Sequence, residues 1–101
     1  MNSLPRDIQN TLQHWSKMHR DILRPACISV SELTCLTYIY LSGTETAWTL
    51  FNYGIYSSYP AVLRCVRQLL KKGYIDKNGI NYYLTGKGEL LILKFADFLK
   101  A

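Results

Sequence analysis

The chain contains 101 residues, 49% of them hydrophobic, and its 12 basic and 7 acidic residues give a net charge of +5. This length predicts a single domain over residues 1–101, and the hydrophobic content excludes an intrinsically disordered chain. No apolar run approaches the roughly 20 residues that cross a membrane, and the first residues lack the pattern of a signal peptide. We therefore expect a cytoplasmic protein that does not enter a membrane.

The cysteines and histidines do not form a metal-site pattern. Cys27, Cys35 and Cys65 are odd in number and include no C-x-x-C pair, which fits reduced, buried thiols better than a disulfide framework. A zinc site needs about four ligands at close spacing. His14 and His19 are five residues apart, so a helix would place them on different faces. We expect no metal and no other cofactor.

Residues 4–23 predict a first helix, with Ser3 as its N-cap and Pro5 in its first turn. Pro25 is expected to end it. Its apolar residues recur at helical spacing and form one stripe: Ile8, Leu12, Trp15, Met18 or His19, and Ile22. This stripe either packs on the core of its own chain or faces a second subunit in part.

A second helix is predicted over residues 31–41. Ser29 or Ser31 caps it, and Glu32 is favourable in its first turn. Its core face consists of Leu33, Leu36, Ile39 or Tyr40, and Leu41.

A third, short helix is expected from Thr44 to about Asn52. Three apolar residues at positions i, i+3 and i+4 face inward: Ala47, Leu50 and Phe51. Trp48 either joins the core or forms a partly exposed shelf.

Residues 58–72 predict a fourth helix with two chemically different faces. Ser57 or Ser58 caps it, and Pro60 suits its first turn. One face is apolar and carries Val62, Val66, Leu69 and Gly73. The opposite face carries Ser57, Pro60, Arg64, Arg67, Gln68 and Lys71. Lys71 and Lys72 also complement the negative end of the helix dipole, so at least one of them could serve stability.

A two-stranded hairpin follows, turned at Asn78-Gly79, because both residues accept the positive φ of a type I′ turn. A two-residue loop there pairs Lys77 with Ile80, Asp76 with Asn81, Ile75 with Tyr82, and Tyr74 with Tyr83. This register directs Ile75, Tyr82 and Leu84 toward the core.

The last helix, about residues 87–100 with Thr85 as its cap, is apolar around much of its circumference. Its apolar residues are Leu90, Leu91, Ile92, Leu93, Phe95, Phe98 and Leu99. A terminal helix of a small domain cannot be surrounded by its own chain, so two apolar faces favour a partner. We expect a homodimer built from the first and last helices.

The net charge is concentrated in the stretch from Ser57 to Gly88. It holds six basic residues (Arg64, Arg67, Lys71, Lys72, Lys77 and Lys87) and one acidic residue, Asp76. This local charge of +5 equals that of the whole chain, so the rest of the molecule is neutral on balance. The placement favours an anionic partner for this stretch.

The order helix, hairpin, helix is the layout of a winged helix-turn-helix. Gly73-Tyr74-Ile75 after Leu69-Leu70-Lys71-Lys72, then Tyr83-Leu84-Thr85-Gly86-Lys87-Gly88, resembles the signature of MarR-type transcription regulators over roughly residues 30–93. The resemblance implies an α+β, mostly helical fold with an N-terminal helix (1–27), a winged-helix core (28–86) and a C-terminal helix (87–101). It also implies dimers formed through terminal helices. This chain departs from the family in its short length, its two-residue wing tip and Asp76-Lys77-Asn78, where the family has an arginine.

The resemblance implies a sequence-specific regulator of double-stranded DNA, usually a repressor, with helix 58–72 in the major groove and hairpin 74–84 as the wing. Arginine can bind guanine in bidentate fashion, glutamine can bind adenine in the same way, and lysines contact phosphates. The expected DNA-binding residues are Ser57, Ser58, Tyr59, Ala61, Arg64, Arg67, Gln68, Lys71, Lys77 and Lys87. Tyr59 is equally compatible with packing against the hairpin.

Other interpretations remain beside this one. A winged helix can serve as a protein-interaction module without binding DNA, which the apolar terminal helices favour. An enzyme is not expected, because no nucleophile–base set or phosphate-binding loop is present. A small-molecule effector is compatible with the fold but has no supporting motif. Cys65 beside Arg64 leaves a redox role open, although burial as a small apolar residue fits it better.

Overall fold

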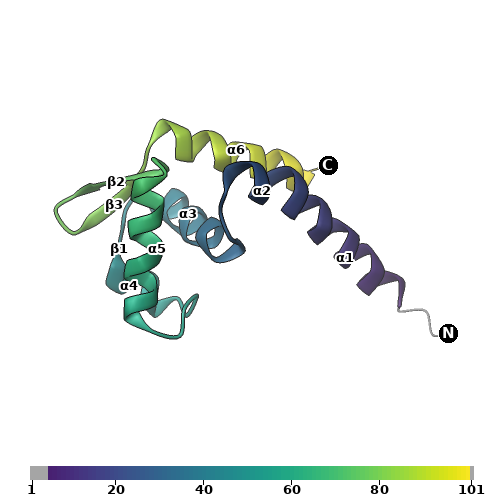
Figure 1. The fold of residues 1–101 in the computed structure, drawn as a ribbon, viewed down its shortest axis with the longest axis horizontal. Coiled ribbons are helices and arrows are strands. Elements are labelled where there is room, and N and C mark those ends of the chain that lie inside the picture. Colours follow the sequence, from purple (N-terminus) through teal and green to yellow (C-terminus); the bar gives the residue numbers. More distant parts are fainter. Residues whose placement is uncertain (1–4, 101) are drawn as a thin grey trace.

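The computed structural model describes residues 5–100 and shows a mostly helical α+β fold with a small antiparallel sheet (Figure 1). In chain order the elements are α1 (Arg6–Met18), the π-helix η1 (His19–Leu23), α2 (Arg24–Ala26), α3 (Val30–Ser42), β1 (Glu45–Thr46), α4 (Ala47–Asn52), α5 (Tyr59–Lys71), β2 (Ile75–Asn78), β3 (Asn81–Leu84) and α6 (Gly86–Lys100). The fold class expected from the sequence is confirmed. Ser3, expected to cap the first helix, lies outside the described residues.

The sequence predicts that Pro25 ends the first helical segment, but the segment continues to Ala26. The five-residue π-turn η1 precedes the proline, and such turns loosen the regular i to i−4 hydrogen-bond pattern that a proline interrupts. The segment ends at Cys27, which has a left-handed backbone conformation with φ 58°. The amide of Ile28 then donates to the carbonyl of Leu23 at 3.1 Å, which closes the helix end.

Side-chain caps fix where the central helices begin. Ser29 and Glu32 form a reciprocal capping box at the start of α3. The third helix begins later than expected, at Ala47, because Thr46 is its N-cap and accepts from the amide of Thr49. Glu45 and Thr46 instead form strand β1, which no sequence pattern indicated.

The three strands lie in the order β1-β3-β2, so β3 is the central strand. The hairpin register differs from the expected one, since Asn78 pairs with Asn81 and Ile75 with Leu84. The loop is Gly79-Ile80, with φ 62° at Gly79. Cys27 is the only non-glycine with positive φ among residues 5–100, so the loop has the glycine-first pattern of a type II′ turn. The buried face is nevertheless as expected, because the shift moves each partner by two positions and preserves the alternation of faces.

The core lies where α3, α5 and the sheet meet. Its fully buried side chains are Cys35, Leu36, Ile39, Leu50, Val62 and Leu69. The buried face predicted for α5 is therefore confirmed, and Leu91 and Ile92 attach α6 to the same core.

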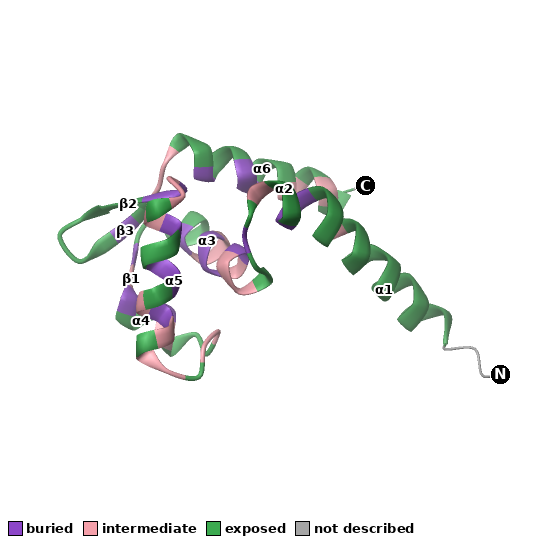
Figure 2. Ribbon diagram, viewed as in Figure 1, coloured by how far each residue is buried: buried purple, intermediate pink, exposed green. Residues whose placement is uncertain are grey.

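Helix α1 projects from this body and has no buried residue (Figures 1 and 2). Ile8, Leu12 and Trp15 on α1 are exposed, as are Leu90, Leu93 and Leu99 on α6. The rings of His14 and Phe98 lie 4.6 Å apart and link the two helices. The C-terminal end of the predicted stripe, Met18 and Ile22, thus packs on the core, whereas Ile8, Leu12 and Trp15 do not. Both terminal helices present apolar side chains to solvent.

Candidate nucleic-acid interface

Helix α5 presents a polar, basic face opposite its buried one. Ser58 caps the helix and accepts from the amide of Ala61 at 3.4 Å, and proline stands in the first turn. Residues spaced by three and four positions share one side of a helix. Four exposed residues follow this spacing and form a single row: Arg64, Arg67, Gln68 and Lys71.

This row has no ionic partner of its own. None of the four side chains forms a hydrogen bond or ion pair with another residue of the described range 5–100. Exposed cations without a carboxylate partner keep their full charge available for an external anion. The row is thus free to contact phosphates and base edges.

Lys77 adds a further cation from the hairpin. It is exposed on β2, and its ammonium lies 5.8 Å from the centre of the Tyr82 ring. Burial raises the pKa of the Tyr82 phenol, which stays neutral beside the lysine. Lys77 therefore extends the basic surface from α5 onto the wing.

Two basic residues from the same stretch are engaged inside the molecule. The ammonium of Lys72 donates to the carbonyl of Cys27 at 2.6 Å and to the carboxylate of Glu32 at 3.2 Å. Lys87 donates to the carbonyl of Lys72 at 2.7 Å and lies 4.5 Å from the ring centre of Tyr74. Both stabilise the end of α5. Lys87 is exposed, but its ammonium already has these internal partners.

The other expected residues surround the start of α5. Ser57 is exposed, whereas Ser58, Tyr59 and Ala61 are half-buried. The Tyr59 ring lies 5.8 Å from the ring of Trp48 and meets Phe51 edge-on at 6.0 Å. Tyr59 thus packs mainly on aromatic residues of α4.

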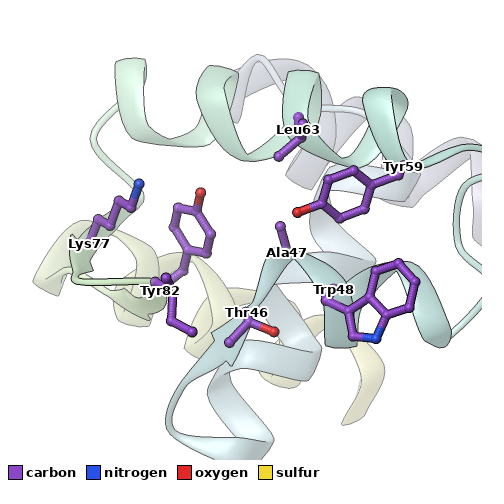
Figure 3. Close-up of a pocket in the computed structure, with 8 residues that line it drawn as sticks. Thr46, Ala47, Trp48, Tyr59, Leu63, Lys77 and Tyr82 are labelled. Atoms are coloured by element: carbon purple, nitrogen blue, oxygen red, sulfur yellow. The ribbon is translucent and has the colours of Figure 1, made fainter.

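A shallow pocket of about 280 Å³ separates the start of α5 from the hairpin (Figure 3). It is lined by Thr46, Ala47, Trp48, Tyr59, Leu63, Lys77, Ile80 and Tyr82. In Figure 3, Lys77 and Tyr82 lie along one side, and Tyr59 and Trp48 lie along the other. The start of α5 and the hairpin are therefore joined by a hollowed, partly aromatic surface.

Two exposed apolar residues of this surface were not among the expected site residues. Trp48 is 59% exposed, so it forms a shelf and is not part of the core. Ile80 at the hairpin tip is 73% exposed. The register error concealed Ile80, because the expected turn placed it in a strand beside Lys77 and not at the apex.

The described part of the chain offers no metal site. Among residues 5–100, no group of three or more histidine, cysteine, aspartate or glutamate side chains could hold a metal ion. In the same range no single helix is long and apolar enough to cross a membrane. One pair of helices, Arg6–Ala26 and Val30–Ser42, passes by combined length and composition but is bent by 78°.

Two solved structures resemble the chain closely in fold. The reduced form of MarR from E. coli aligns with a TM-score of 0.72 and 19% identity, over 97% of this chain and 73% of that chain. The oxidised form of the same protein aligns with a TM-score of 0.68 and 20% identity, over 97% and 74% of the two chains. The chain has a MarR-like winged-helix fold. No protein-family model and no curated protein matches the sequence.

In this MarR-like arrangement, α4 and α5 are the helix-turn-helix pair and β2–β3 form the wing (Figure 1). The stretch identified from the sequence as resembling MarR-type regulators thus folds as the resemblance implied.

Proposed function

We propose that the protein is a DNA-binding transcription regulator, acting as a repressor, in which α5 enters the major groove and the β2–β3 hairpin contacts the flanking backbone. The observation that supports this most is the unpaired basic row on α5 with Lys77 beside it. A major groove about 12 Å wide admits a helix, and arginine and glutamine can read guanine and adenine there. In this proposal Arg64, Arg67 and Gln68 read bases, whereas Lys71 and Lys77 contact phosphates.

The residues at the start of α5 complete the proposed interface. Ser57, Ser58, Tyr59 and Ala61 lie at the positive end of the helix dipole, where backbone amides and hydroxyls favour a phosphate. Lys87 has the weakest case among the expected residues, because its ammonium must leave the Lys72 carbonyl to reach DNA.

We further propose that the protein binds as a homodimer that covers the exposed apolar residues of α1 and α6. A symmetric dimer presents two α5 helices to the two halves of one site.

The test is fluorescence anisotropy on duplex DNA across a salt series, with the wild type and the Arg64→Ala/Arg67→Ala variant. We expect wild-type binding to weaken steeply with salt. Because Arg64 and Arg67 read bases in this proposal, the variant is expected to bind more weakly with little change in this slope, which the phosphate contacts of Lys71 and Lys77 set at about 0.9 for each phosphate. Removing an arginine that reads a base is also expected to cost roughly 1–3 kcal/mol of discrimination against the wrong base.

The matched control is Arg6→Ala/Arg24→Ala, which removes the same charge from exposed positions on α1 and α2. If both double variants weaken binding equally, overall charge and not the α5 row accounts for it. Absence of binding at low salt would contradict the proposal and favour a protein-interaction module that uses the apolar terminal helices.

A further inference from the structure

Two buried thiols face each other between α3 and α5. The sulfur atoms of Cys35 on α3 and Cys65 on α5 lie 3.7 Å apart, in hydrogen-bond contact. Cys35 is 0% exposed and Cys65 is 5% exposed. Cys27 is exposed at the end of α2 and is not part of this pair.

The surroundings make the two thiols chemically unequal. The hydrogen bond between the two thiols, with a second to the Tyr56 hydroxyl, lowers the pKa of Cys65, although burial opposes this. The same hydrogen bond and burial raise the pKa of Cys35. The charged groups that act on the pair are Glu32 and Lys72, which bind each other. Cys65 is therefore both the more accessible thiol and the one that ionises first.

We propose that Cys35 and Cys65 form a two-thiol modification site that a hydroperoxide converts to an internal disulfide. The Cys65 thiolate attacks one peroxide oxygen, which gives a sulfenic acid and releases an alcohol, or water from hydrogen peroxide. The Cys35 sulfur then attacks the Cys65 sulfur, the S–S bond forms, and the hydroxyl leaves as water with the Cys35 proton. Two thiols are oxidised, and the peroxide is reduced.

Closing the bond moves the helix that carries the basic row. The sulfur atoms must approach from 3.7 Å to about 2 Å. Cys65 lies on the buried face of α5, whereas Arg64 and Arg67 are exposed on the same helix. Drawing Cys65 toward α3 therefore shifts or rotates α5, and the row moves with it. The effect on DNA affinity rests on the proposed function, whereas the disulfide itself does not.

The site is tested without DNA on the full-length Cys27→Ser variant, which retains only the buried pair. After hydrogen peroxide treatment and alkylation, non-reducing peptide mass mapping is expected to show Cys35 linked to Cys65, with the loss of two hydrogen atoms. Dithiothreitol is expected to reverse the linkage. Recovery of both thiols as alkylated cysteines, or of over-oxidised Cys65 alone, would overturn the site. This mapping needs no substitution in the core.

The coupling to α5 is tested on the duplex bound in the salt series. Oxidised protein is expected to bind roughly tenfold more weakly, a usual magnitude for coupling between sites, and Cys35→Ser is expected not to respond once its folding is verified by circular dichroism. A mapped disulfide with unchanged affinity would overturn the coupling. If the reduced protein binds no duplex, the proposed function fails, and the mapping still decides the thiol site.

Discussion

Glu45 is a buried carboxylate that holds the start of the helix-turn-helix pair. It accepts hydrogen bonds from the hydroxyl of Thr49 and, at 2.7 Å, from the phenol of Tyr53. Tyr53 in turn stacks on Tyr38 with ring centres 4.0 Å apart. Burial opposes ionisation of Glu45, but hydrogen bonds from Ser42, Thr49 and Tyr53 outweigh it and lower the pKa. The ionised form is therefore the one that stabilises the fold.

Replacing Glu45 by glutamine is expected to lower stability at neutral pH and to flatten its pH dependence in acid. Because the folded-state pKa lies below the ordinary value of 4.5, the stabilisation is present above that pH. It is lost as the pH falls through the folded-state value. Urea unfolding of both proteins between about pH 3 and pH 7 measures this difference. Glu89→Gln, at an exposed position, is the control. If wild type and Glu45→Gln lose the same stability between pH 7 and pH 3, Glu45 is not the carboxylate responsible.

Single residues also show how far the sequence predicts the site. The basic row on α5 could be predicted, because helical spacing alone puts Arg64, Arg67 and Lys71 on one side. The engagement of Lys87 could not, because its acceptor is the Lys72 carbonyl, which the hairpin brings close from 15 residues away. From the sequence alone such a lysine is indistinguishable from other surface charges. Only the tertiary structure shows which group its ammonium binds.

At the level of elements, the helices were predicted well and the sheet less well. Caps and apolar spacing are local signals, and they predicted α3, α5 and α6 to within a few residues. Strand β1 is two residues long and exists through its pairing with β3, so no periodicity reveals it. The hairpin register depended on Asn78-Gly79 as a turn signal. A type II′ turn with Gly79 first lets Asn78 stay extended and pairs Ile75 with Leu84, both apolar.

The packing of α6 against the end of α5 depends on Gly88. A Cβ atom added there would lie 2.1 Å from the carbonyl oxygen of Tyr74, which is backbone and cannot turn away. Alanine normally favours a helix by up to about 1 kcal/mol over glycine. Here Gly88→Ala is expected to lower the free energy of unfolding by roughly 1–3 kcal/mol, as for an overpacked core.

Chemical denaturation compares this variant with Gly86→Ala. Gly86 lies in the same first turn of α6, and a Cβ atom added there would meet no other atom within 4 Å. Alanine at this position is therefore expected to be neutral or stabilising. Equal stability of the two variants would contradict the prediction, because it would show that the backbone at Tyr74 moves away from the added Cβ atom at no cost.

For the whole molecule, the exposed stripe of α1 predicts self-association. Leu12→Glu/Trp15→Glu places two charges on this stripe and is expected to convert a dimer to the 11.7 kDa monomer, as measured by sedimentation equilibrium. Both side chains are exposed in the single chain, so the domain itself is expected to stay folded. The control variant is Asn10→Glu/Gln13→Glu, which adds the same charge at exposed positions outside the stripe. A monomeric wild type would contradict the prediction.

Hydrogen bonds connect the end of α5 to the start of α6, and we call this connection the joint. Thr85 donates its amide to Tyr74 at 3.1 Å and its hydroxyl to the Gly73 carbonyl at 2.5 Å, and Lys87 binds the Lys72 carbonyl. In a dimer assembled through α1 and α6, this joint sets the distance and angle between the two α5 helices. If this dimer binds DNA as proposed, it reads two half-sites together only when their separation fits that distance, usually one helical turn of DNA, about 10–10.5 base pairs. The joint would then select operators by the length of their spacer, and a change there would alter the preferred spacing without touching a base-reading residue.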